Sequence, residues 1–383
     1  MTDTENIPKQ ILHLDHFQED VSILIGENGS GKSTLLNKLS KYFLDNGKSV
    51  VALANSIHDK FDSGHRNFKT LRGRSGRRQT RETLKNALEK IGPNDLQRLK
   101  NASRALQYVG FDPMIGFKID KLSPNYNSLI LESDLSLNEK EQLNYLLQKT
   151  IRESTTNEII WLQVEDFSFS ELAKSSLTEL FQWESALKKI RAIERIEVFL
   201  KKENIIISML DASSGELALI TSIVYLSTII TENTVILIDE PENSLHPKWQ
   251  KQYAQVLFDI FYLYQPKIII ATHSPLIVNG AELFTTEPKI FKADKFSFEL
   301  QKKEPLNVEE ILYRFFDVTT PQNRFLSDVV VRLLNFLANG KISLQEFKTK
   351  IEQMENNAYD PKQIQVLNSI VNIASEISQP PRQ

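Results

Sequence analysis

Apolar and polar positions follow two kinds of pattern along this chain. Short, almost continuous apolar runs are typical of buried strands, and they lie at residues 21–25, 49–54, 234–238 and 267–271. Apolar residues three to four positions apart predict helices, and this spacing covers residues 32–45, 217–230 and 248–264. Strands that alternate with helices and are apolar on both faces predict an α/β fold with a mostly parallel sheet covered on both sides.

The remaining regions give weaker patterns. Residues 10–25 alternate and predict one or two short strands, and a hairpin is expected from Arg195–Leu200 with Ile205–Leu210. Residues 82–200 are expected to be mainly helical, with helices over Glu82–Ile91, Leu96–Val109, Leu137–Ile151, Ser168–Phe181 and Trp183–Ile193, and strands at Met114–Ile119 and Ser128–Leu131. Residues 289–302 predict a strand pair, and the tail predicts helices over Val308–Phe315, Phe325–Leu337, Leu344–Met354 and Pro361–Ile373.

Composition narrows the class of protein. The 383 residues are 41% hydrophobic and 25% charged, which is typical of a folded globular chain. The absence of cysteine excludes disulfides, Cys-ligated zinc and thiol catalysis, and it agrees with a reducing compartment. The first ten residues are polar and do not resemble a signal peptide, and no apolar run approaches the ~20 residues that span a bilayer. We therefore expect a cytoplasmic protein.

Charge is unevenly distributed. The net charge is −3, yet His58–Arg81 holds eight Lys or Arg residues and only two Asp residues, a local charge of +6. Gly73, Ser75 and Gly76 suit a loop that could wrap an anion, so the segment could contact phosphate, in a nucleotide or a nucleic acid. A solvated loop, or a positive patch for an acidic partner subunit, is the alternative.

One glycine-rich stretch carries a specific chemistry. Gly26–Thr34 reads GENGSGKST, and it lies between a buried apolar run and a helical pattern. That context is required by the phosphate loop G-x-x-x-x-G-K-[ST], in which glycines let successive N–H groups face one anion. We expect Lys32 to reach the β- and γ-phosphates and Ser33 to hold Mg²⁺. The candidate nucleotide-binding residues are Gly26, Asn28, Gly29, Ser30, Gly31, Lys32, Ser33 and Thr34.

Three further motifs follow in the C-terminal half. Asp239 and Glu240 end a buried strand, where an acidic side chain is costly unless it meets a cation, so Asp239 is a candidate Mg²⁺ ligand and Glu240 a candidate base. A helix-capping acidic pair is the alternative. His273 ends another buried strand, where it could equally be a core histidine. Ser213, Ser214 and Gly215 open an apolar helix and form a candidate second anion site.

In this order, GENGSGKS, SSGE, VILIDEPENSLHP and ATHS resemble the heads of ABC-type ATPases. The resemblance implies that two heads sandwich ATP, with Ser213 and Gly215 of one head binding the γ-phosphate held by the other. It implies that Glu240 is the catalytic carboxylate, Ser244 to Pro247 the dimer-crossing loop and His273 the switch histidine. The candidates for the family's lid glutamine are Gln79 and Gln163.

The variant DEPENSLHP followed by ATHSP resembles the overcoming-lysogenization-defect, RecF and SMC-like branch more than the transporter branch. Residues 281–383 contain no Asp-x-Asp, which the TOPRIM nuclease of the first of these groups carries. The chain therefore resembles the ATPase subunits of antiphage systems such as Septu, PARIS and some retrons, in which a separate nuclease or toxin subunit is the effector. A DNA-repair ATPase that binds DNA directly and an energy-coupling subunit of a transporter are the alternatives.

These expectations divide the chain into four regions. Residues 1–81 would form the N-terminal part of the head, with the phosphate loop and the basic segment, and residues 201–304 its C-terminal part. Residues 82–200 would be a mainly helical insertion, and residues 305–383 a helical extension. We expect ATP and Mg²⁺ as ligands, a homodimer or higher oligomer, and no membrane contact.

Overall fold

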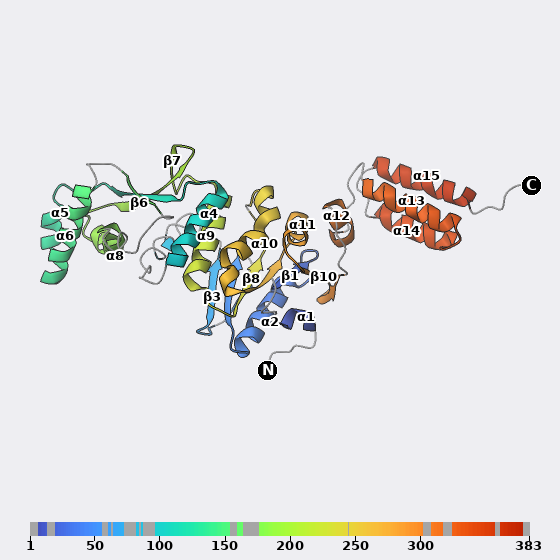
Figure 1. Cartoon of the computed structure of the whole chain (residues 1–383), viewed down its shortest axis with the longest axis horizontal. Coiled ribbons are helices and arrows are strands. Elements are labelled where there is room, and N and C mark those ends of the chain that lie inside the picture. Colours follow the sequence, from blue (N-terminus) through green and yellow to red (C-terminus); the bar gives the residue numbers. More distant parts are fainter. Residues whose placement is uncertain are drawn as a thin grey trace, which may run out of the picture.

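The computed structural model describes the following parts of the chain: residues 7–13, 20–55, 60–62, 64–72, 82, 83, 86, 96–153, 159–163, 176–243, 245–301, 308–316, 324–356 and 361–377. Figure 1 shows an elongated molecule with a central α/β head, a lobe built around a second sheet at one end and a helical bundle at the other. Within the described residues, no helix is both long and apolar enough to cross a membrane.

The head is built on a seven-stranded sheet in the order β11-β10-β1-β9-β8-β2-β3. All neighbouring strands run parallel except β10 and β11, which form an antiparallel hairpin, so the predicted mostly parallel α/β sheet is confirmed. The strands are β1 (Asp20–Ile25), β2 (Ser49–Ala54), β3 (Phe68–Arg72), β8 (Thr234–Asp239), β9 (Lys267–Ala271), β10 (Lys289–Asp294) and β11 (Ser297–Leu300).

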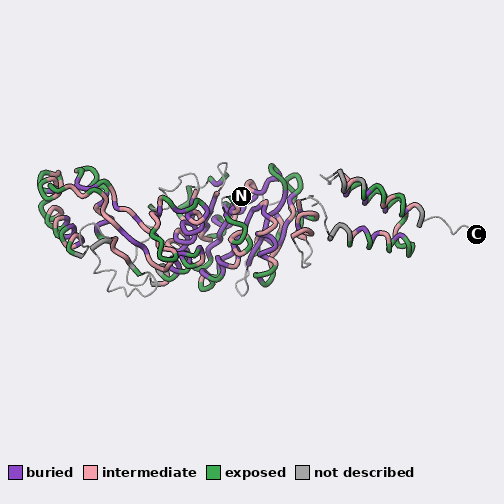
Figure 2. The backbone as a smooth tube through the Cα atoms, turned by 90° about the horizontal axis from the view of Figure 1, so that it is seen from above, coloured by how far each residue is buried: buried purple, intermediate pink, exposed green. Residues whose placement is uncertain are grey.

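Alternate residues of these strands face two separate cores. In β8, Val235 and Leu237 belong to the core beneath α2, whereas Ile236 and Ile238 belong to the larger core on the opposite face. Because both faces are covered, β1, β8 and β9 are buried at every position, and Figure 2 shows that buried residues gather in the central part of the molecule. The helices of the head are α1 (Lys9–Leu12), α2 (Lys32–Asp45), α4 (Leu96–Val109), α9 (Ser214–Ile229), α10 (Pro247–Phe261), with the short 3₁₀ turn η2 (Tyr262–Tyr264), and α11 (Pro275–Phe284).

A buried ion pair holds the three strands around the phosphate loop in register. Lys267 Nζ lies 2.9 and 2.8 Å from the two carboxylate oxygens of Asp20, and both side chains are almost fully buried. Lys289 Nζ of β10 reaches the same carboxylate at 3.4 Å. Charges buried this deeply are tolerated when they are paired, so the starts of β1, β9 and β10 are fixed relative to one another.

The lobe contains a four-stranded antiparallel sheet in the order β5-β4-β6-β7; helix α8 packs against β6, α6 packs on α8, and α5 packs on α6. The hairpin β6–β7 was predicted, but the pairing of β4 with both β5 and β6 makes this region richer in strands than the sequence suggested. Its elements are β4 (Met114–Asp120), α5 (Tyr126–Leu131), α6 (Leu137–Glu153), β5 (Ile160–Gln163), α8 (Ser176–Lys189), β6 (Arg195–Lys202) and β7 (Ile205–Ser208).

The tail divides into two parts. Helix α12 (Val308–Phe316) packs on α11, and its Ile311 and Phe315 lie in the main core of the head. The other three tail helices form a bundle with a core of its own, centred on Phe347, Ile351 and Leu367. They are α13 (Arg324–Ala338), α14 (Leu344–Asn356) and α15 (Pro361–Ile377).

Three local predictions were wrong. Residues 9–12, expected as strand, form the short helix α1 after Pro8, whose φ of −59° suits a helix start. Residues 128–131, also expected as strand, are the end of α5, and only Ile130 of that helix is buried. Residues 176–189, which were expected to contain the end of one helix and the start of another, form one helix, α8, which ends before Arg191, where φ is +60°; residues 168–175 of the first expected helix lie outside the described residues. Short apolar runs do not distinguish helix from strand.

Candidate nucleotide-binding site

The candidate site lies at the carboxyl ends of β1, β8 and β9. Because these parallel strands are adjacent, the residues that follow them meet at one edge of the sheet. The phosphate loop follows β1, Asp239 ends β8, and Thr272 and His273 follow β9. The sheet therefore brings together three motifs that are far apart in the sequence.

The phosphate loop has the backbone that its glycines predict. Gly26, Gly29 and Gly31 have φ values of +146°, +82° and +101°, a region that side chains other than hydrogen disfavour. At Gly26 a Cβ atom would also come within 2.8 Å of the Ala293 carbonyl oxygen. Asn28 and Gly29 are exposed at the tip of the loop, and α2 begins directly after Gly31.

Lys32 is folded back over the loop. Its Nζ donates to the carbonyl oxygens of Gly26 at 2.8 Å and Glu27 at 3.0 Å. Burial lowers the pKa of Lys32 to about 8, although the carboxylates of Glu240, Asp239 and Glu242 act in the opposite direction. A buried ammonium that is held only by neutral carbonyls is well placed to bind an anion entering the loop.

Ser33 and Asp239 meet as predicted. Ser33 Oγ donates to Asp239 Oδ1 at 3.1 Å, joining the first turn of α2 to the end of β8. The other oxygen, Asp239 Oδ2, is buried without a hydrogen-bond partner among the described residues. Burial raises the pKa of Asp239 to about 6, and the bond from Ser33 opposes this. A hydroxyl and a carboxylate with an unused buried oxygen fit Mg²⁺, a cation that prefers oxygen ligands.

Glu240 lies next to this pair in a strained backbone conformation. Its φ is +52°, which a residue with a side chain adopts at a cost, and its N–H donates to the Ala271 carbonyl at 2.9 Å. Asn243 Nδ2 donates to Glu240 Oε2 at 3.1 Å. His273 Nε2 lies 3.8 Å from Glu240 Oε1, and burial together with Lys32 lowers the pKa of His273, which favours its neutral form, whereas Glu240 acts in the opposite direction.

The structure adds Glu242, which the sequence did not indicate. Its half-buried carboxylate accepts from the Thr272 hydroxyl at 2.8 Å and from the His273 backbone N–H. Burial raises the pKa of Glu242, although these hydrogen bonds oppose the shift. Glu242 therefore fixes the segment that carries His273. The only sign of Glu242 in the sequence was a second acidic residue two positions after Glu240, and no neighbouring residue indicated its contacts.

Gln250 of α10 is another residue that the sequence did not indicate. It donates to the Leu245 carbonyl at 2.9 Å and accepts from Ser274 Oγ at 2.7 Å. Ser274 caps α11, and Leu245 lies in the expected dimer-crossing loop. Gln250 thus joins that loop to the segment after β9. Ser244 of the same loop lies outside the described residues.

Ser213, Ser214 and Gly215 begin α9, as predicted. Ser213 and Ser214 are exposed, whereas Gly215 is buried. Ser213 Oγ accepts from the Glu216 N–H at 3.2 Å and Glu216 accepts from the Ser213 N–H at 3.1 Å, a reciprocal cap. Lys202 Nζ holds the Glu216 carboxylate at 3.1 Å. The described hydrogen bonds of Ser213 stay within this helix start, and none joins it to the phosphate loop of the same chain.

Part of the basic segment reaches the site. Lys60 Nζ donates to Thr34 Oγ1 at 2.8 Å, next to Ser33, and Arg72 donates to the Phe61 carbonyl at 2.6 Å. The arginines from 74 to 81 and the lid candidate Gln79 lie outside the described residues. The other lid candidate, Gln163, ends β5 in the antiparallel sheet, and no hydrogen bond among the described residues joins it to the phosphate loop.

Comparison with known proteins agrees with this geometry. A family model described as "AAA domain, putative AbiEii toxin, Type IV TA system" matches residues 137–279. The "Retron Vc95 probable ATPase" of Vibrio cholerae is 24% identical over 68% of this chain and 67% of its own length. The "Retron Ec83 probable ATPase" of Escherichia coli is 27% identical over 40% of this chain and 33% of its own length.

Among solved structures, cbiO1 from Clostridium perfringens, part of an ABC transporter complex, covers 78% of this chain and 80% of its own, with 12% identity. Its TM-score of 0.29 is too low to support a functional argument. The family match, the phosphate loop and the Ser33–Asp239 pair together support ATP hydrolysis by an ATPase of the ABC type. In sequence the chain is similar to the two retron ATPases.

Proposed function

We propose that this ATPase dimerises around two ATP molecules and uses their binding and hydrolysis to control a separate effector subunit in antiphage defence. The single observation that carries the proposal is the arrangement of the two anion sites. Ser213 and Ser214 are exposed at the start of α9, and their described hydrogen bonds leave the phosphate loop of the same chain uncontacted. A second copy could therefore offer this helix start to the γ-phosphate.

In this proposal each side chain has one task. The loop N–H groups and Lys32 bind the phosphates, while Ser33 and Asp239 hold Mg²⁺, which would neutralise phosphate charge. Glu240 orients the attacking water and accepts its proton, because its carboxylate is partly exposed beside Asp239. His273, whose neutral form is favoured by burial, would hydrogen-bond the γ-phosphate region from the end of β9.

In this proposal, the bundle of α13, α14 and α15 contacts the effector subunit. It has its own core, yet Val331, Phe336, Val366 and Ile373 remain between 42% and 58% exposed. Large exposed apolar side chains on one small unit favour contact with another protein. The names of the retron relatives are what suggest antiphage defence, and we extend it to this chain only as a proposal.

Association in solution tests the first half of this proposal. Light scattering with Mg²⁺ and a slowly hydrolysed ATP analogue should give twice the monomer mass, while Lys32→Ala stays monomeric because it cannot bind the phosphates. A monomer at every protein concentration would contradict dimerisation. Co-purification from the native operon tests the second half: we expect an effector subunit that a chain without residues 317–383 no longer retains.

Direct DNA binding is the alternative, and the basic segment favours it. Its +6 charge would make DNA binding fall steeply with added salt. Reversing the charge of Arg74, Arg77 and Arg78 would then abolish DNA stimulation of ATPase activity. If those variants behave like wild type and no DNA binds at low salt, the segment has another role, such as the contact that Lys60 makes with Thr34.

A further inference from the structure

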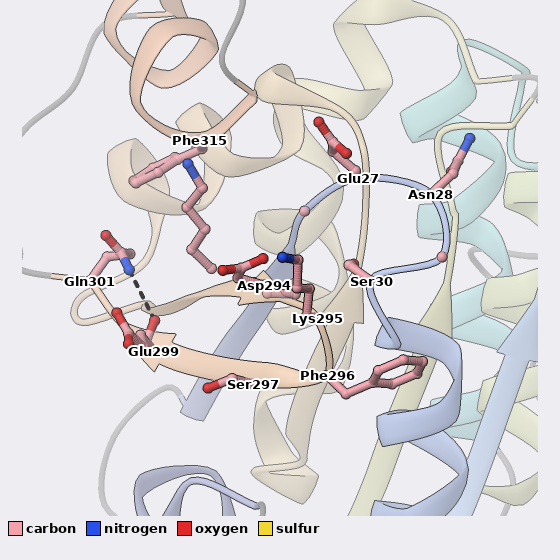
Figure 3. A pocket seen from close by; sticks show the side chains of 14 residues that line it. Glu27, Asn28, Ser30, Asp294, Lys295, Phe296, Ser297, Glu299, Gln301 and Phe315 are labelled. Carbon is pink, nitrogen blue, oxygen red and sulfur yellow. Dashed lines mark hydrogen bonds between the residues drawn. The ribbon is translucent and has the colours of Figure 1, made fainter. Parts of the chain in front are cut away.

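A cavity of about 740 Å³ adjoins the phosphate loop on the side away from Asp239. One wall is the loop itself, from Gly26 to Ser30, and the other is the β10–β11 hairpin, with Phe315 of α12 behind them. Figure 3 shows Glu27, Asn28 and Ser30 on one side and the hairpin residues Asp294, Lys295 and Phe296 on the other. Its size falls within the range of pockets that hold small molecules, about 300–1,000 Å³.

The expected orientation of a bound nucleotide would place its sugar and base at this cavity. In the sheet, β1 lies between β9 and β10, and β8 with Asp239 lies beyond β9. A nucleotide that places its terminal phosphates near Ser33 and Asp239 can extend its sugar and base over the phosphate loop toward the opposite flank of β1. That flank is β10, where the cavity opens.

We propose that this cavity binds the purine nucleoside of ATP and that the ring of Phe296 stacks on the base. The inference rests on the proposed binding of ATP at the phosphate loop, and it adds the part of the site that recognises the base. Phe296 is 60% exposed although it is a large apolar residue, which leaves ring surface open for stacking.

The hairpin tip is tied to the phosphate loop, so the ring is held in place. The Phe296 N–H donates to the Ser30 carbonyl at 3.1 Å. The edge of the ring lies so close to Gly31 that a Cβ atom there would come within 2.5 Å of Phe296 Cδ1. Lys295 and Phe296 have φ values of +44° and +69°, a turn that costs energy for both residues and directs Phe296 toward the loop.

Polar groups around the cavity suit a base with an amino group. Ser30 lines the cavity and is only 9% exposed, and its Oγ has no hydrogen-bond partner among the described residues. Asp294 and Glu299 add carboxylate acceptors, and Gln301, whose Nε2 donates to the Glu299 carbonyl, adds an amide oxygen. These acceptors complement the exocyclic amino group of adenine and the hydroxyls of the ribose.

Equilibrium binding tests this inference with ATP and with inorganic tripolyphosphate, which has the phosphates and no base. We expect Phe296→Ala to weaken ATP binding about tenfold or more, because a base loses its stacking partner, while tripolyphosphate binding stays unchanged. Phe296→Trp should bind ATP as tightly as wild type. Phe336→Ala, at an exposed phenylalanine of the distant bundle, is the matched control and should bind both ligands normally.

The possible results separate this inference from the proposed function. Wild-type affinity for ATP in Phe296→Ala would overturn the stacking role alone. An equal loss of ATP and tripolyphosphate would also overturn it, since the variant would then be disturbing the phosphate loop. Wild-type protein that binds neither ligand would overturn nucleotide binding at the loop itself, and with it both proposals.

Discussion

At the scale of single residues, two glutamates of the candidate site make different contacts. Glu240 is partly exposed, contacts Asn243 and lies 3.8 Å from His273. Glu242 is also half-buried, but it accepts hydrogen bonds from the hydroxyl of Thr272 and the backbone N–H of His273. Two glutamates only two positions apart thus have different surroundings, which predicts different consequences when each is replaced.

Replacing Glu240 with Gln should leave ATP binding intact and lower turnover by about 10²-fold or more, as expected when a positioned base is lost. The amide keeps the shape of the side chain and the hydrogen bond to Asn243 but cannot accept a proton from water. Steady-state phosphate release and ATP binding measured on the same preparation check this. Turnover like that of wild type would show that Glu240 is not the base.

Replacing Glu242 with Ala should instead lower stability. The N–H of His273 and the hydroxyl of Thr272 would lose their acceptor, and a buried donor left unpaired costs about 1–3 kcal/mol. Denaturant unfolding should show this loss for Glu242→Ala and a smaller one for Glu240→Ala. Equal stability of the two variants would show that Glu242 does not hold the segment after β9.

At the scale of elements, the sequence predicted long, strongly patterned segments well. The runs at β1, β8 and β9 are apolar at nearly every position, and the cap residues of α2 and α9 mark where those helices start or end. Short segments failed: the run at residues 128–131 has too few residues to separate strand from helix, and it proved to be the end of α5.

Some features depend on contacts between distant residues and have no local signal. The partners of Glu242 lie 30 and 31 positions away along the chain, so only the folded sheet brings them together. The same holds for the pairing of β4 with β6 and for the position of Phe296 against Gly31. The phosphate loop and the Ser33–Asp239 pair could be predicted because each belongs to a short sequence motif that is recognisable without knowledge of the fold.

The tail offers a prediction about elements. Helix α12 buries Ile311 and Phe315 in the core of the head, whereas α13, α14 and α15 have a separate core. A chain ending after Phe316 should therefore keep the melting temperature and ATPase activity of the head. A chain ending after Gln301 also loses α12 and should melt several degrees lower, because removing one buried Phe alone costs about 3–5 kcal/mol.

The two truncations are matched, since they differ only by the segment that contains α12. Calorimetry with ATPase assays on both would compare them. If the shorter chain is as stable as the longer one, α12 contributes nothing to the head. If instead the chain ending after Phe316 unfolds at the lower temperature as well, the bundle stabilises the head.

At the scale of the whole molecule, the account depends on two copies of the chain. A single chain provides a phosphate loop, an acidic pair and, apart from them, an exposed helix start at Ser213. In a symmetric dimer each of the two sites would take its phosphate loop from one copy and Ser213 from the other. Activity would then depend on which residues meet across the interface.

Mixing two inactive variants tests this claim most directly. Lys32→Ala removes the phosphate-binding ammonium, and Ser213→Asp keeps a good helix cap while its charge repels the γ-phosphate. Each variant alone should lack ATPase activity. Mixed in equal amounts they should recover about a quarter of wild-type activity, because half of the dimers would contain one intact site. A mixture that stays as inactive as its components, although both variants are folded and a mixed dimer forms with ATP, would contradict the composite site.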